Sequence, residues 1–202
     1  MLGKTHMAVG IAATMAVTQP ATVPELILAV GGGSLGALIS DIDVGTSESH
    51  RDADKITILS VVVVAAVLAL DYFFQAGIMN KVIGNSGYGR MIAGVLLFIG
   101  ICAFGKEQPH RSFMHSFLAL ALLCFAIGLV WETAVVFFAT GFLSHLLTDI
   151  FNKKKVRLLY PLKCGAALGL FHASGLANQL FFGVGSAVAV LEIVIFAGRI
   201  FH

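Results

Sequence analysis

Seven side chains of metal-binding type are scattered through a chain that is otherwise strongly apolar. They are His6, Asp41, Asp43, His110, His115, His145 and Asp149. Ionisable groups are costly in or near hydrocarbon, so those that occur in such a chain usually have a function. A mixture of imidazole and carboxylate without thiolate favours zinc, or another first-row ion such as manganese. The sequence therefore predicts a metal site with one to three ions, provided that the fold brings these residues together.

The segment Ser-His-Leu-Leu-Thr-Asp (144–149) has the best local geometry for binding an ion. Residues four apart lie on one face of an α-helix, so His145 and Asp149 could hold a single ion between them. The alternative is an aspartate that is hydrogen-bonded to a neighbouring histidine near the end of a helix.

The segment His-Arg-Ser-Phe-Met-His-Ser (110–116) combines two imidazoles with a guanidinium group. We expect Ser112 to cap a helix, with His110 and Arg111 in the preceding loop and His115 in the first turn. A helix N-terminus near a guanidinium suits an anion such as phosphate, whose charge Arg111 would neutralise. The alternative is that Arg111 anchors the helix at lipid headgroups.

Asp41 and Asp43 are separated by one residue at the end of an apolar run. Two such carboxylates could hold one ion jointly, or supply one ligand and one general base, for which Asp43 is our candidate. The alternative is a solvated helix end. His6 is the weakest candidate, and only its expected place at the same membrane face connects it with the others.

The composition predicts a membrane protein. Of the 202 residues, 58% are hydrophobic and 12% are charged, whereas a soluble domain carries about 25% charged residues. We expect an all-α fold, a polytopic transmembrane bundle of about six to seven helices with short loops, formed by residues 1–202 as one domain. The three cysteines, Cys102, Cys124 and Cys164, have no metal-binding spacing, and we expect them to act as small hydrophobic residues.

Apolar runs predict the positions of the helices, since a full span needs about 20 such residues. The expected helices are 7–17 and 24–40, which would form a short hairpin, then 56–74, 91–104, 112–131, 133–150 and 179–197. Small residues in the second helix, Gly31–Gly33 and Gly36, would allow close packing of helices. Residues 162–178 could form either an interfacial helix or a re-entrant loop.

The basic residues predict the orientation in the membrane. With the spans above, ten of the 13 lysines and arginines fall on the side of the N-terminus. The positive-inside rule makes that side cytoplasmic. The seven candidate ligands fall at the same face, on four helix ends, although the spans were placed without reference to them.

Four segments match a known family when they are taken in order. They are Thr-His-Met-Ala-Val-Gly (5–10), Asp-Ile-Asp (41–43), His-Arg-x-x-x-His-Ser (110–116) and Ser-His-Leu-Leu-Thr-Asp (144–149). With these segments the chain resembles, over residues 3–163, the YdjM-like family of inner-membrane metal-dependent hydrolases, which includes a LexA-regulated member. The family is distantly similar to zinc-dependent phospholipase C and S1/P1-type nucleases. This chain departs from the family in lacking a proline before Asp41.

The resemblance implies a bacterial inner-membrane protein with phosphoester chemistry. We therefore expect a metal-dependent hydrolase that acts at the cytoplasmic face on a phospholipid or another membrane-associated phosphoester. Membrane lipids are the expected partners, and nucleic acid is not expected.

Two other functions remain open. The first is a metal-ion transporter or channel; ligands at helix ends and the lack of an internal repeat count against it, but Glu192 and the glycine-rich second helix keep it open. The second is a non-catalytic membrane protein with a structural metal.

Overall fold

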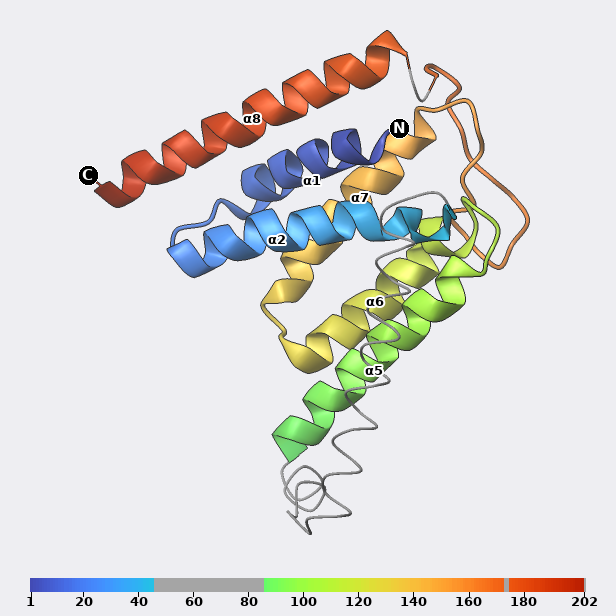
Figure 1. Cartoon of the computed structure of the whole chain (residues 1–202), viewed down its shortest axis with the longest axis horizontal. Helices are drawn as coiled ribbons and strands as arrows, with labels where there is room; N and C mark the ends of the chain where they lie inside the picture. Colours follow the sequence, from blue (N-terminus) through green and yellow to red (C-terminus); the bar gives the residue numbers. More distant parts are fainter. Residues whose placement is uncertain (46–85, 173–174, 202) are drawn as a thin grey trace.

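The computed structural model describes residues 1–45, 86–172 and 175–201 of the chain. These parts contain six α-helices and no named strand, which confirms the all-α class. The helices are α1 (Gly3–Thr18), α2 (Val23–Ile39), α5 (Ser86–Lys106), α6 (Phe117–Val130), α7 (Ala134–Ile150) and α8 (Leu176–Phe201) (Figure 1). Two 3₁₀ turns are added, η1 (Ser40–Asp43) directly after α2 and η2 (Phe113–His115) before α6. The helix expected at 56–74 lies outside the described residues.

The helices form a bundle in which α2 and α1 occupy the middle. α2 packs against α7 and α1, α1 also packs against α8, and α5 pairs with α6. Figure 1 shows α8 beside α1 at one edge of the described bundle and the α5–α6 pair at the other. The start of α1 and the ends of α2 and α7 lie at the same end of the molecule, together with the loops that precede α6 and α8.

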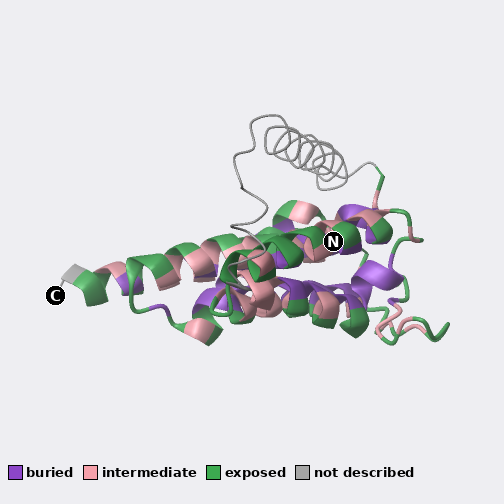
Figure 2. Ribbon diagram, turned by 90° about the horizontal axis from the view of Figure 1, so that it is seen from below, coloured by how far each residue is buried: buried purple, intermediate pink, exposed green. Residues whose placement is uncertain are grey.

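The outer surface of the bundle is apolar. Large hydrophobic side chains such as Phe125, Leu147 and Leu180 are about 60% exposed, and Figure 2 shows that most of α8 is exposed or half-buried. Three stretches are long and apolar enough to cross a membrane, namely Val23–Asp43, Gly87–Lys106 and Leu176–Ile200. α6 and α7 are apolar but shorter than a full span. A surface of this kind is suited to contact with lipid tails.

Close packing of α2 against α7 depends on glycines. A Cβ atom at Gly36 would collide with the backbone carbonyl of Phe138 and lie 2.8 Å from the backbone nitrogen of Phe142. A Cβ atom at Gly31 would meet nothing within 4 Å. Of the glycines expected to allow close helix packing, Gly36 therefore does so and Gly31 does not.

We predict that Gly36→Ala lowers the free energy of unfolding by about 1–3 kcal/mol, because the added methyl group must push α2 away from α7. Gly31→Ala, in the same helix, should be neutral or stabilising by up to about 1 kcal/mol. Thermal unfolding of the two variants in detergent checks this. Equal destabilisation by both substitutions would contradict the close contact at Gly36.

The structure differs from the sequence-based expectations at the starts of α6 and α5 and decides an open alternative in the loop before α8. The N-cap of α6 is Ser116, whose hydroxyl oxygen accepts a hydrogen bond from the backbone N–H of Ala119 at 3.2 Å. Ser112 therefore does not cap this helix, and His115 lies in the turn η2 rather than in the first helical turn. α5 begins at Ser86, five residues before the start of the helix expected at 91–104. Of the two structures expected for residues 162–178, the interfacial helix is not found at 162–172, which form a loop with single β-bridges between Val156 and Ala166 and between Asn152 and Phe171.

Candidate metal centre

The fold brings all seven predicted ligand residues together at one end of the bundle. His6 lies on α1, the two aspartates lie in η1, His110 lies in the loop after α5, and His115 lies in η2. His145 and Asp149 lie in the last turns of α7. The residues form two groups, and within each group the donor atoms lie within 4.8 Å of one another. The first group is Asp41, Asp43, His110 and His115, and the second is His6, His145 and Asp149. Five of the seven residues are buried, the exceptions being Asp41 and His110.

Four donor atoms from both groups surround one point. The Nε2 atoms of His115 and His145 are 3.2 Å apart. Asp41 Oδ1 lies 3.6 and 3.7 Å from these two nitrogens, and Asp149 Oδ2 lies 3.6 and 3.9 Å from them. Four donors arranged tetrahedrally at about 2.1 Å from a zinc ion are separated by about 3.4 Å. The separations of the two nitrogens from each other and from both oxygens are close to this value, so the four residues are a candidate set for a single ion.

The hydrogen bonds of His145 set which of its nitrogens can bind a metal. Its Nδ1 lies 2.6 Å from the backbone carbonyl oxygen of Ala37. A carbonyl oxygen only accepts, so Nδ1 carries the proton and donates it, which leaves a lone pair on Nε2. That lone pair faces the carboxylates of Asp41 and Asp149 and the imidazole of His115. Metal-binding histidines are commonly held in this way by a hydrogen bond from the other ring nitrogen.

His6 is oriented by the same logic through Thr148. The hydroxyl of Thr148 has one proton, which it donates to the backbone carbonyl oxygen of Ser144 or His145, at 3.0 and 2.9 Å. The Thr148 oxygen therefore accepts from Nδ1 of His6, 2.9 Å away. His6 Nε2 then carries a lone pair; it has no hydrogen-bond partner and lies 3.4 Å from Asp149 Oδ1. Asp149 Oδ1 also accepts from the N-terminal ammonium group of Met1 at 3.1 Å, so a metal bound by His6 would be a second cation beside this carboxylate.

Thr148 thus gives a test of the donor geometry. We predict that Thr148→Val weakens zinc binding by about 10–100-fold, because the His6 ring loses the acceptor that sets its tautomer. Thr140→Val is the matched control, since Thr140 lies on the same helix, is half-buried, and donates to the Val136 carbonyl oxygen away from the candidate ligands. Competition of the purified protein with a zinc-binding dye measures both affinities. Equal affinities for the two variants would show that Thr148 does not orient a ligand.

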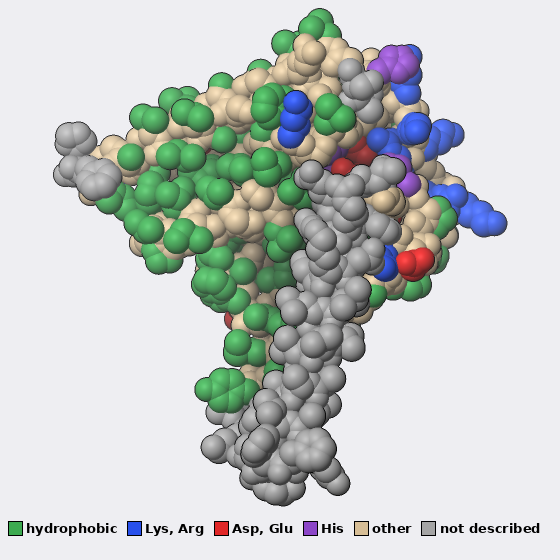
Figure 3. Space-filling view, in the orientation of Figure 1, with side chains coloured by type: hydrophobic (Ala, Val, Ile, Leu, Met, Phe, Trp, Pro, Cys, Tyr) green, Lys and Arg blue, Asp and Glu red, His purple; other side chains and the backbone are tan. Residues whose placement is uncertain are grey.

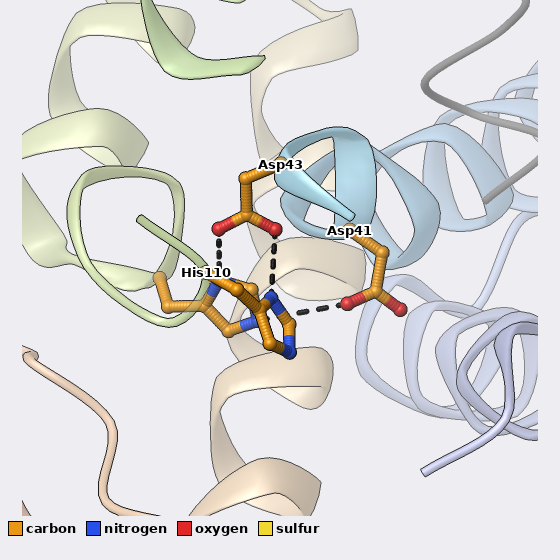
Figure 4. A group of neighbouring side chains, drawn as sticks. Asp41, Asp43 and His110 are labelled. Atoms are coloured by element: carbon orange, nitrogen blue, oxygen red, sulfur yellow. Dashed lines mark hydrogen bonds and ion pairs between the residues drawn. The ribbon is translucent and has the colours of Figure 1, made fainter. Parts of the chain in front are cut away.

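Asp43 contacts the outer side of this arrangement. Its Oδ1 lies 2.9 Å from His110 Nδ1, and its Oδ2 accepts from the Arg111 backbone N–H at 3.1 Å and lies 3.4 Å from His115 Nδ1 (Figure 4). Figure 4 shows that Asp41 and Asp43 both extend from η1 toward the His110 loop. Asp43 therefore holds His115 from the ring nitrogen opposite the one that faces Asp41 and Asp149.

The carboxylates around His115 favour positive charge. Burial disfavours the imidazolium form, but hydrogen bonds that His115 donates to the carboxylates of Asp149, Asp41 and Asp43 outweigh burial and raise the pKa of His115 well above its ordinary value. In the metal-free protein the His115 proton supplies that charge, and Nε2–H can donate to the lone pair on His145 Nε2. A divalent cation at the same point would satisfy the carboxylates equally, with release of the proton.

Arg111 links the donors to the surrounding loops. Its Nη2 lies 3.0 Å from Asp149 Oδ2, and its Nη1 donates to the Lys154 carbonyl oxygen at 2.6 Å. The side chain is 92% buried, and its Nε has no hydrogen-bond partner. The backbone of Arg111 adopts a left-handed conformation, with φ at +65°. Such a conformation is unfavourable for a residue with a side chain and is concentrated at functional sites.

Two polar residues of the site, Thr148 and Asn152, were not predicted from the sequence. Besides Thr148, Asn152 donates from Nδ2 to Asp149 Oδ1 at 2.7 Å. Each lies three residues after a candidate ligand, so helical spacing from His145 and Asp149 was the available signal. Of the other histidines, His172 lies outside the cluster, 2.9 Å from Lys153 Nζ. His50 lies outside the described residues.

Comparison with known proteins shows the family. The model of the YdjM inner membrane protein family matches residues 1–200. The chain belongs to this family. Membership of the YdjM family supports a place in the inner membrane, in agreement with the apolar helices. A search of curated proteins found no match. A search of solved structures also found none.

Proposed function

We propose that this YdjM-family protein is a membrane-embedded, metal-dependent hydrolase of phosphoesters. The observation that carries the proposal is the buried four-donor set formed by His115, His145, Asp41 and Asp149, with an arginine paired to one of its carboxylates. Zinc fits a set of imidazole and carboxylate donors, and manganese is the second candidate. The seven candidate residues supply more donor atoms than a single ion needs.

The residues would divide the work as follows. His6, His115, His145, Asp41 and Asp149 would hold the metal. When bound, a divalent cation supplies Lewis-acid polarisation of a phosphoryl oxygen and activation of water. Arg111 would place its unpartnered Nε, and the charge of its guanidinium group, beside the phosphoryl oxygens.

The contacts of Asp43 favour a positioning role. It accepts from two groups and contacts the far nitrogen of His115, so it would orient that imidazole toward the metal. Our hypothesis from the sequence, in which Asp43 is the general base, stays a prediction. Asp43→Asn and Asp43→Ala would separate the general-base role from the positioning role. Loss of a base lowers turnover and leaves metal binding unchanged, whereas loss of a positioning residue weakens metal binding as well.

Substrates at a membrane surface fit the position of the site. The donors lie at the ends of apolar helices, and basic side chains gather at the same end (Figure 3). We propose that this end faces the cytoplasm, where basic residues are enriched. Cys164 is exposed and lies in the loop between α7 and α8, at this end of the bundle. Its labelling by a membrane-impermeant maleimide in inverted vesicles, and its protection in intact cells, would support this orientation.

The test is hydrolysis by the full-length protein in detergent. We expect slow release of phosphate or of a phosphorylated headgroup from phospholipids and lipid phosphates, abolished by chelation and restored by about one equivalent of zinc or manganese. A protein that binds metal but hydrolyses none of these substrates would favour the structural-metal alternative. Metal-dependent uptake of the ion into liposomes, without hydrolysis, would favour transport.

A further inference from the structure

A second feature adjoins the metal centre: a cavity of about 290 Å³ on the surface at the same end of the bundle. Its lining residues are Pro109, His110, Arg111, Lys155, Arg157, Lys163 and Gly165. Four of these seven carry a permanent positive charge, and none is acidic. The usual alternation of charges on a protein surface is absent here, so the pocket presents a concentrated positive potential.

Backbone hydrogen bonds hold the pocket in shape. The N–H of Arg157 donates to the Arg111 carbonyl oxygen at 3.0 Å, which joins the loop after α7 to the loop before α6. Val156 and Ala166 exchange two backbone hydrogen bonds, of 2.8 and 2.9 Å. These bonds place Lys155 and Arg157 beside the segment that carries Lys163. The cations are thus brought together by the fold rather than by chance proximity of flexible side chains.

Arg111 is the point where the pocket meets the metal donors. Its buried guanidinium is paired with Asp149 through Nη2, while Nε has no hydrogen-bond partner and the residue lines the pocket. A buried N–H group without a partner is unfavourable by about 1–3 kcal/mol, and an acceptor in the pocket would satisfy it. His110 also belongs to both places, since its Nδ1 contacts Asp43 and its side chain lines the pocket.

We propose that this pocket binds the phosphate group of a multiply anionic phosphate ester, one that carries no ammonium group. Guanidinium and ammonium donors are the usual ligands for phosphate oxygens, and phosphate offers several acceptors to a partly buried arginine. A choline or ethanolamine headgroup would bring its own positive charge next to four cationic lining residues, and none of the described lining residues is a carboxylate. The inference that this phosphate is the reacting group, or adjoins it, rests on the proposed function; binding itself does not.

The test compares two double variants that each remove two lysines from the same loop region. Lys155→Gln/Lys163→Gln changes two lysines of the pocket, and Lys153→Gln/Lys154→Gln changes two exposed lysines whose side chains do not line it. General attraction of anions to this face falls equally in both. Titration calorimetry would measure binding of phosphatidate in detergent micelles, of phosphatidylcholine in the same micelles, and of soluble glycerol 3-phosphate.

We expect the pocket variant to bind phosphatidate at least about tenfold more weakly than the parent, and the control variant to lose less than about threefold. Phosphatidylcholine should not bind in the pocket of the parent or of either variant. Binding of phosphatidate without glycerol 3-phosphate would assign a lipid ligand, and equal binding of both would assign a soluble phosphate ester. Equal losses in the two double variants, or no phosphate binding by the parent, would overturn the proposal.

The same titrations with metal-free and zinc-loaded protein separate this proposal from the hydrolase. A pocket that binds phosphate in a protein without hydrolytic activity would leave the pocket standing and remove the enzyme. Zinc binding, hydrolysis and phosphatidate binding that all survive unchanged in Lys155→Gln/Lys163→Gln would keep the enzyme and remove the pocket.

Discussion

Replacing His145 and Asp149 together by alanine will remove tightly bound metal from the purified protein. Both residues belong to the four-donor set, and the unprotonated Nε2 of His145 faces the other three donors. We expect zinc affinity to fall by more than about 100-fold, because loss of two of four donors leaves an incomplete coordination shell. Elemental analysis of the parent and of the variant, each purified in zinc-containing buffer, measures the stoichiometry directly.

The control must remove the same two kinds of side chain elsewhere. His172→Ala/Glu132→Ala does so, since neither residue belongs to a candidate metal group in the described parts of the chain. The alanine pair leaves Arg111 without its buried carboxylate, which can destabilise the fold by about 3–5 kcal/mol. His145→Gln/Asp149→Asn, with similar volume, is the second variant, and circular dichroism reports whether each protein remains helical. Full retention of metal in a folded variant would contradict the proposed metal site.

Replacing Arg111 by glutamine will lower kcat by about 10²–10³-fold while metal stays bound, if the protein hydrolyses a phosphoester. The arginine contacts the donors through Asp149 but offers no donor atom to a cation, so its loss affects charge on the reacting phosphoryl group. Arg111→Lys keeps the charge without the planar fork and should recover only part of the activity. Rates across a substrate series, with zinc content measured on the same samples, separate kcat from KM and from metal loss.

Arg90→Gln provides the comparison for Arg111. Arg90 is exposed on α5, near the opposite end of that helix from the metal centre, so its substitution should leave zinc content and turnover unchanged. Loss of zinc from Arg111→Gln in proportion to its loss of activity would mean that the arginine only supports Asp149. A parent-like rate in Arg111→Gln would exclude any part for this residue in the reaction.

The positions of most helices could be predicted from the sequence. Long apolar runs mark segments that avoid water, and this preference does not require knowledge of the tertiary contacts. The helices at 24–40, 91–104, 133–150 and 179–197 were placed close to α2, α5, α7 and α8. The pairing of His145 with Asp149 followed from helical spacing alone. Boundaries were less certain: the capping of α6 by Ser116 rather than by Ser112 depends on η2, a turn that packs against α5, α6 and η1.

The sequence by itself predicted a helical membrane protein and the gathering of seven candidate metal ligands at one end of its helices. That much follows because hydrophobicity sets the spans and the direction of each span sets which end every polar residue reaches. Only the tertiary structure decided which atoms meet. The 3.2 Å approach of His115 to His145, the tautomers set by Ala37 and Thr148, and the pocket of Lys155, Arg157 and Lys163 join segments far apart in the chain. Those contacts depend on the close packing of α2 against α7 and on the path of the loop after α7, which no local pattern encodes.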